Sequence, residues 1–177
     1  MNFDISPLLN DWEYRPGQID VRKFKGKDGR DKIQLRVDLG LLQMNAVGRP
    51  DGKRPYGHES LLEHFEARLS KHLEEHDGRE DGFRMSAEDC SRLQQEAIQY
   101  HHRYICLFQL QDYKGVIRDT ERNLKVFDFV ERFADTHEVA AAFQQFRPQL
   151  LMMRIRPKGA QALDSEAHAR AIEIIRQ

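Results

Sequence analysis

Residues 86–130 read SAEDCSRLQQEAIQYHHRYICLFQLQDYKGVIRDTERNLKVFDFV, and this stretch decides the fold. Apolar residues recur every three or four positions on both sides of Asp112, which is the spacing of one helix face. Ser86, with Asp89 three residues later, begins the first run and Asp112 begins the second; Ser and Asp commonly cap helix N-termini. We therefore predict two antiparallel helices with a short connection. Their apolar stripes are Leu93, Ala97, Tyr100, Tyr104 and Phe108, then Tyr113, Val116, Ile117, Thr120, Leu124, Phe127 and Val130.

Further helices are predicted on either side of this pair. A helix over about 59–75 has on one face Leu61, Leu62, Phe65, Leu69 and Leu73. Downstream, a helix begins near Glu138, is kinked by Pro148 and has candidate breaks at Pro157 and Gly159, because proline lacks the N–H that a helix interior uses. A last helix is predicted from about Ser165, with an apolar stripe of Ala167, Ala171, Ile174 and Ile175.

The N-terminal third contains the one convincing β region. Every second residue from 33 to 41 is apolar, which is the pattern of a half-buried strand, and a weaker alternation covers Ile19, Val21 and Lys23. Lys27-Asp28-Gly29 lies between the two runs, and glycine accepts the positive φ of a tight hairpin. We predict an antiparallel β-hairpin, with room for a third short strand from Met44 to Val47.

These patterns define the predicted architecture. Two prolines and three glycines in residues 48–57 exclude regular structure there. The predicted division is an N-terminal tail, β-hairpin and basic loop over 1–57, and a helical-hairpin domain over 58–177, which together form one compact unit. The fold class is mostly α, an antiparallel array of helical hairpins with a small N-terminal β-hairpin.

Charge is balanced overall but uneven along the chain. The net charge is −1 over 177 residues. Residues 15–54 carry a net charge of +6, and residues 59–99 carry −6. Such segments either attract each other within one fold or expose a basic face to a partner.

The cysteines and the N-terminus favour a cytoplasmic location. Cys90 and Cys106 fall in one predicted helix, roughly 24 Å apart at about 1.5 Å of rise per residue, which is beyond disulfide reach. Reduced thiols fit a reducing compartment. The chain has no apolar run that approaches a membrane span, and its first residues lack the pattern of a signal peptide.

Several segments resemble known families. Residues 111–119, QDYKGVIRD, resemble the turn between the two helices of a tetratricopeptide repeat, and are similar to the short helical hairpin that the excision-repair proteins UvrB and UvrC share. A longer resemblance is to an uncharacterised bacterial family often labelled UvrB/UvrC-motif-containing. It rests on IQLRVDLGLLQM at 33–44, GRPDGKRPYGHESLL at 48–62, YHHRY at 100–104 and RDTERNL at 118–124. This resemblance implies the fold described above and implies no particular activity.

The loop before the first long helix holds the candidate binding residues. Basic and aromatic side chains gather there beside a predicted helix N-terminus, where free N–H groups favour anions. Phosphate, nucleic acid or a carboxylate would suit such a site. Alternatively, the same bases pair with Glu59, Glu63 or Glu66 in the following turns. The candidate ligand- or partner-binding residues are Arg49, Lys53, Arg54, Tyr56 and His58.

Two histidine patterns are candidate metal sites. Residues 72–76, HLEEH, match the His-x-x-Glu-His pattern of one metalloprotease class, in which two histidines one turn apart bind Zn²⁺. The match lies at a predicted helix end, and no third ligand stands out. Neighbouring residues on a helix point about 100° apart, so His101 and His102 cannot chelate one ion together; one is expected beside the core and the other in solvent. We expect no metal site and no cofactor.

Three functions follow from these observations. The leading hypothesis is a non-catalytic helical scaffold that binds another protein. The alternative is a DNA-repair-associated nucleic-acid-binding protein that uses Arg49, Lys53 and Arg54. The third is a metal-dependent hydrolase, for which His72, Glu75 and His76 are the candidates. No membrane partner is expected.

Overall fold

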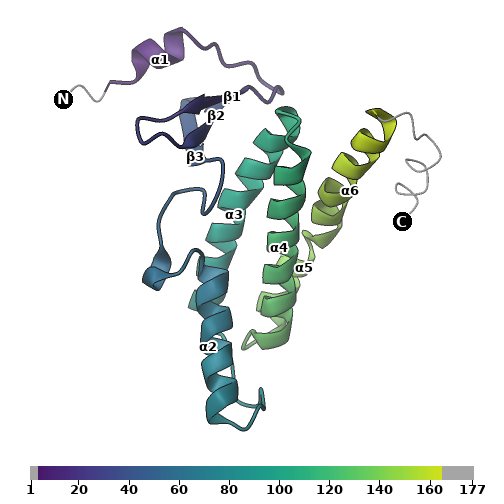
Figure 1. Ribbon diagram of the computed structural model, residues 1–177. Coiled ribbons are helices and arrows are strands. Elements are labelled where there is room, and N and C mark those ends of the chain that lie inside the picture. Colours follow the sequence, from purple (N-terminus) through teal and green to yellow (C-terminus); the bar gives the residue numbers. More distant parts are fainter. Residues whose placement is uncertain (1–3, 165–177) are drawn as a thin grey trace.

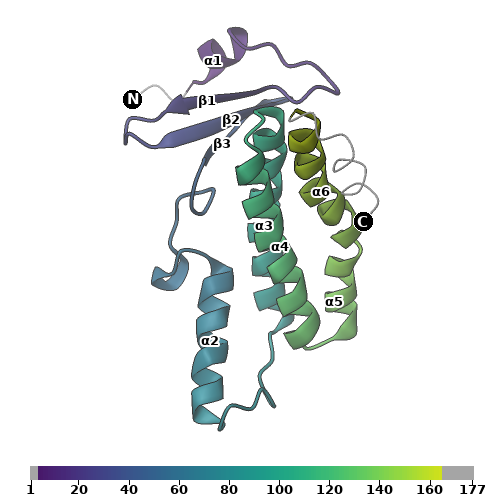
Figure 2. The same ribbon diagram turned by 45° about the vertical axis from the view of Figure 1, so that its right-hand side comes forward.

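The computed structural model describes residues 4–164. It is mostly helical, with a small antiparallel sheet of three strands. Figures 1 and 2 show a long hairpin of α3 and α4 as the axis, with the sheet at one end, α2 beside the other end, and α5 and α6 along the side. The elements are α1 (Ser6–Asn10), β1 (Val21–Lys25), β2 (Asp31–Val37), β3 (Gly40–Asn45), the short 3₁₀ helix η1 (Pro55–Gly57), α2 (Leu61–Glu75), α3 (Ala87–Gln109), α4 (Tyr113–Phe133), α5 (His137–Gln144) and α6 (Arg147–Asp164).

The α3–α4 hairpin confirms the prediction from residues 86–130. The Ser86 hydroxyl accepts a hydrogen bond from the Asp89 backbone N–H at 3.1 Å, and the Asp112 carboxylate accepts one from Gly115 at 3.0 Å. Each cap satisfies an N–H that the first helical turn leaves unpaired. The facing stripes form the centre of the core, whose fully buried members include Leu93, Leu107, Val116, Val126 and Val130.

The predicted β-hairpin is confirmed, but the strands end elsewhere than the alternation indicated. Gly29 adopts a φ of 72° in the first turn. The apolar alternation continues to residue 41, whereas β2 ends at Val37 and the chain reverses through Asp38-Leu39. Leu39 lies at the tip with 90% of its surface exposed, so its apolar character does not reflect burial. The third strand therefore begins at Gly40 rather than at Met44.

The sheet order is β1-β2-β3, with Val21 opposite Leu35 and Ile33 opposite Met44. Ile33 and Met44 are buried and belong to the same apolar core as the α3–α4 hairpin. The sheet is thus joined to the helices by a continuous core.

The predicted fourth helix is two helices. α5 ends at Gln144 and α6 begins at Arg147, so Pro148 lies in the first turn of a new helix instead of kinking an existing one. A proline removes no helical hydrogen bond in a first turn, where the N–H groups are unpaired anyway. α6 then continues through Pro157 and Gly159 to Asp164, so the predicted break there is wrong. The helix is held in place because its buried residues pack on the core. The last helix predicted from Ser165 lies outside the described residues.

Within residues 4–164, no helix combines the length and the apolar character that crossing a membrane requires.

Candidate functional site

Arg49, the first candidate of the loop, is held inside the molecule. Its guanidinium donates through Nε to Glu96 Oε2 at 2.7 Å and through Nη1 to both oxygens of Asp51 at 2.8 and 2.9 Å. Its side chain is almost entirely buried. Arg49 therefore fixes the loop to α3 and is occupied by two carboxylates.

Glu96 is the centre of this arrangement. Its fully buried carboxylate accepts hydrogen bonds from Arg49, from Arg122 on α4, and from the backbone N–H of Leu61 at 2.9 and 3.1 Å. Buried carboxylates are tolerated when several donors satisfy them. The residue thereby joins the loop and the start of α2 to the central hairpin. The sequence suggests Glu59, Glu63 or Glu66 as partners of the loop bases, and it does not point to Glu96 directly. The position of Glu96 beside Ala97, on the apolar face of α3, is the one sign that its carboxylate is buried.

A second buried pair lies one to two turns further along the hairpin. Arg103 forms a two-pronged ion pair with Asp119, and its Nη1 donates to the carbonyl oxygens of Asn45 at 3.0 Å and Gly48 at 2.6 Å. Arg118 also donates to Asp119, and to the Ala46 carbonyl oxygen at 3.1 Å. The chain that leaves β3 is thus held by arginines from both helices.

Tyr100 lies between the two pairs. The guanidinium carbons of Arg103 and Arg122 lie 4.8 and 4.2 Å from its ring centroid, within the range of cation–π attraction. Burial, and to a smaller degree the charge of Arg49, lowers the pKa of Arg122 to about 9. Arg122 therefore still carries its positive charge at neutral pH. The whole cluster is a structural clamp, since its charges face one another rather than a ligand.

Tyr56 has a different environment. Its backbone adopts φ 51° and ψ 26°, a left-handed conformation that costs a residue with a Cβ roughly 1–2 kcal/mol. Asp77 and Gln111 also have positive φ, but they follow the ends of α2 and α3, where such a residue commonly ends a helix. Tyr56 follows no α-helix, so its conformation has another cause.

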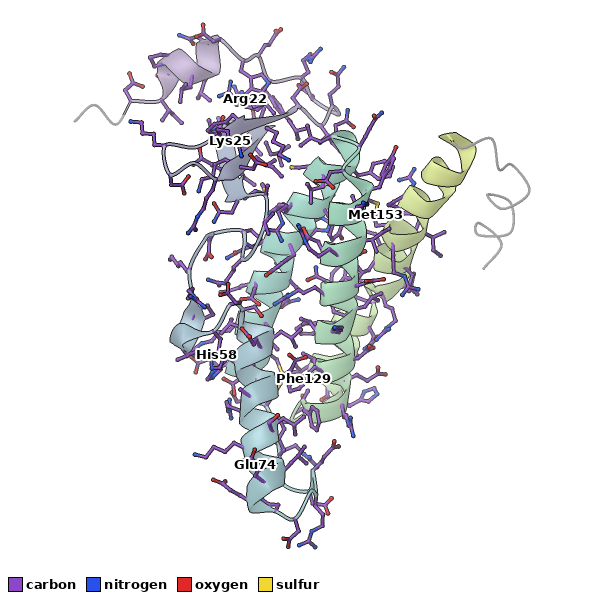
Figure 3. All side chains as sticks on the ribbon, viewed as in Figure 1. Arg22, Lys25, His58, Glu74, Phe129 and Met153 are labelled. Carbon is purple, nitrogen blue, oxygen red and sulfur yellow. The ribbon has the colours of Figure 1, made fainter. Side chains whose placement is uncertain are left out.

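The Tyr56 side chain is held from two sides. Its ring stacks on the His64 ring with centroids 4.3 Å apart, and its hydroxyl accepts a hydrogen bond from Arg92 Nη1 at 2.8 Å. Even so, 62% of the residue is exposed. His58 contributes a third ring, 5.4 Å from that of His64, and Figure 3 shows His58 on the outer flank of the molecule beside the start of α2. Burial and the neighbouring His58 lower the pKa of His64, which favours the neutral form of the stacked imidazole.

The remaining bases of the loop are exposed. Arg54 forms an ion pair with Glu59 in which both side chains are largely solvated, and Lys53 is exposed. One projecting loop therefore carries Lys53, Arg54, Tyr56 and His58, whereas the Arg49 side chain is buried against α3. We call Tyr56, His58, His64 and Arg92 the Tyr56 cluster.

Other bases of the N-terminal segment have carboxylate partners nearby. Asp31 pairs with Lys25 at 2.7 Å and with Lys23 at 3.4 Å. Lys32 pairs with Asp28 at 2.8 Å, and Arg15 pairs with Asp20 at 2.7 Å. These aspartates belong to residues 15–54 and are already counted in its net charge of +6, whereas Arg49 and Arg54 pair with carboxylates of residues 59–99, Glu96 and Glu59.

The two histidine patterns differ from a metal centre. The rings of His72 and His76 stack with centroids 3.9 Å apart, while His72 Nε2 lies 3.0 Å from the Asp81 carbonyl oxygen and His76 Nδ1 lies 2.8 Å from that of His72. Among residues 4–157, whose side chains the structure describes, no three His, Cys, Asp or Glu side chains are grouped to hold a metal ion. His101 and His102 are both half-buried, so the expectation that one of them faces solvent is wrong.

No protein-family model, curated protein or solved structure matches this chain.

Proposed function

We propose that this chain is a non-catalytic helical scaffold that binds another protein through the Tyr56 cluster. The proposal places it in the cytoplasm and gives its helices the topology of tetratricopeptide-like hairpins. The observation that carries the proposal is Tyr56 itself, an exposed aromatic residue held rigid in a strained backbone conformation.

Strain of this kind is stored where the surrounding structure over-determines it, and such places are often functional. Burial of the ring does not account for the conformation, because most of the residue faces solvent. The stacking on His64 and the hydrogen bond from Arg92 hold the ring in one orientation before any partner arrives. A fixed ring loses little entropy on binding, which is how preorganised contacts gain affinity.

The composition of the cluster also suits a protein interface. Tyrosine and arginine are among the residues that most often dominate binding energy. The clamp of Arg49, Glu96, Arg103 and Asp119 supports the cluster, because it fixes the loop and the start of α2 to the hairpin. The cluster therefore stands on a rigid base, as a recognition surface should.

A comparative capture experiment tests the proposal. Purified protein, the Tyr56→Ala variant and the Leu39→Ala variant are immobilised and exposed to native extract, and proteins retained by the unmodified protein and by Leu39→Ala but not by Tyr56→Ala are identified. Leu39 is a matched control because it is also an exposed large side chain on a projecting turn. The recovered protein is then titrated in purified form. We expect Tyr56→Ala to weaken binding and Leu39→Ala to leave it unchanged; equal affinities of the two variants would contradict the proposal.

A further inference from the structure

A cavity opens on the side of the hairpin away from the Tyr56 cluster. It lies between α3, α4 and the turn that joins α5 to α6, and its volume is about 350 Å³. Pockets for small molecules span roughly 300–1,000 Å³ and are mostly apolar with a few polar groups. The cavity is therefore large enough for a compound of one or two rings.

The walls are apolar and aromatic. Tyr104, Phe127, Phe143 and Leu150 are buried residues that nevertheless line the cavity. Phe127 and Phe143 meet edge to face, with ring centroids 5.6 Å apart. At the rim, Ile98 and Phe146 each expose 48% of their surface. An apolar occupant would cover this exposed surface, and the removal of apolar area from water favours binding.

The lining is also uncharged. None of the described residues that line the cavity is Asp, Glu, Lys or Arg, although these types make up 32% of the chain. His101 also lines it, and burial, with a smaller contribution from His102, lowers the pKa of its imidazole. The site therefore offers no countercharge, and an ion would lose its hydration there without compensation.

Gln94 and Gln149 are polar residues of the lining, and the His101–Tyr104 pair can provide a further directional contact. His101 Nδ1 and the Tyr104 hydroxyl lie 2.6 Å apart. When the hydroxyl donates to Nδ1, the Tyr104 oxygen can still accept a hydrogen bond and the His101 Nε2–H can donate one. By contrast, the Asn123 amide is already bound to the Ala97 carbonyl oxygen at 2.9 Å.

From these features we infer that the cavity binds an uncharged, largely apolar small molecule with one hydroxyl or carbonyl group that contacts the His101–Tyr104 pair. This inference is independent of the proposed protein partner, because the cavity shares no residue with the Tyr56 cluster. The size of the cavity, its uncharged lining and the His101–Tyr104 pair together define the ligand class.

Three naphthalene compounds test this ligand class at neutral pH. 2-Naphthol is uncharged and has a hydroxyl, naphthalene lacks the polar group, and 2-naphthoate has the same rings with a negative charge. Binding to the full chain is measured by calorimetry or by ligand fluorescence. We expect 2-naphthol to bind. The affinity for 2-naphthoate should be lower by a factor of roughly ten or more, and a tenfold ratio corresponds to about 1.4 kcal/mol. Absence of 2-naphthol binding, or equal affinity for 2-naphthoate, would overturn the inference.

Two variants locate the binding. Ile98→Glu places a carboxylate at the rim and should abolish the binding of 2-naphthol, whereas Gln95→Glu adds the same charge at an exposed position of α3 that does not line the cavity. Tyr104→Phe should weaken 2-naphthol binding severalfold and leave naphthalene binding unchanged. Melting curves verify that each variant is folded. Equal binding by the Ile98→Glu and Gln95→Glu variants would refute the location. Sedimentation of the ligand-free protein gives a further check, since a dimer that Ile98→Glu dissociates would mean that a second copy covers the cavity.

Discussion

Arg103 on α3 donates two hydrogen bonds to the Asp119 carboxylate on α4, at 2.7 and 2.8 Å, and the two side chains are 1% and 0% exposed. The same guanidinium holds the carbonyl oxygens of Asn45 and Gly48. One ion pair thus fixes the two helices to each other and to the chain that leaves the sheet. The orientation of the loop that carries Tyr56 depends on this junction.

Removal of one member of this pair should be strongly destabilising. Asp119→Leu would leave the Arg103 charge buried without its carboxylate, and such losses cost about 3–5 kcal/mol. The Arg103→Met, Asp119→Leu double variant should be less destabilised than the two single effects predict, with a coupling energy of roughly 1–3 kcal/mol. Urea denaturation of the four proteins measures this cycle. Additive effects would mean that the two residues act separately.

The conformation of Tyr56 predicts an unusual order of stability. Alanine at this position would keep the strained backbone and lose the contacts with His64 and Arg92, whereas glycine adopts positive φ without strain. We expect Tyr56→Gly to be more stable than Tyr56→Ala by about 1 kcal/mol, the lower end of the usual cost of a left-handed residue with a Cβ. The comparison uses the denaturation midpoints of the two variants, which requires that their unfolding free energies depend equally on denaturant concentration. If alanine proves the more stable replacement, the backbone at residue 56 is not left-handed.

Stability should fall in mild acid because of the half-buried His101 and His102. The pKa of His101 is lowered by burial and by His102, and that of His102 by burial, from an ordinary value of 6.5. Because the unfolded chain binds these protons more readily, the contribution to stability is complete above pH 6.5 and is lost as the pH falls towards the lowered values. His101→Gln should flatten this part of the profile. A variant profile parallel to that of the unmodified protein between pH 7 and 5 would exclude His101 as a cause.

Nucleic acid should bind weakly. Lys23, Lys25, Lys32 and Arg49 have carboxylate partners within the fold, so these four bases are less available to displace counterions from phosphates. We expect fluorescence anisotropy of labelled oligonucleotides at about 150 mM salt to show no binding tighter than the 10⁻⁴–10⁻⁶ M of non-specific binders. Submicromolar binding that the Lys53→Ala, Arg54→Ala double variant abolishes would favour the DNA-repair alternative.

Local signals explain the parts of the fold that could be predicted from the sequence. The caps at Ser86 and Asp112 and the stripes that follow them involve residues three or four positions apart, and such spacing is visible in a single sequence. The turn at Gly29 is local in the same sense. These features were sufficient for the central hairpin and for the existence of a small sheet.

The rest depended on contacts between distant residues. Glu96 accepts a hydrogen bond from Arg49, which is 47 positions away in the sequence, and Arg103 donates one to the Asn45 carbonyl oxygen, which is 58 positions away. A sequence shows that a carboxylate or guanidinium is present, but not which partner offsets the cost of burying it. For that reason the sequence alone does not separate Arg49 from the exposed bases of its loop. The strain at Tyr56 was equally hidden, since the residue type gives no sign of positive φ.

Photo-crosslinking from residue 56 tests the proposed function most directly. A photoreactive phenylalanine analogue replaces Tyr56 in one protein and Leu39 in a second, and both are irradiated in living cells. We predict one reproducible protein adduct from position 56 that is absent from position 39, and that is lost when the accompanying change His64→Ala removes the ring on which residue 56 stacks. No adduct from position 56, or the same set of adducts from both positions, would contradict the account.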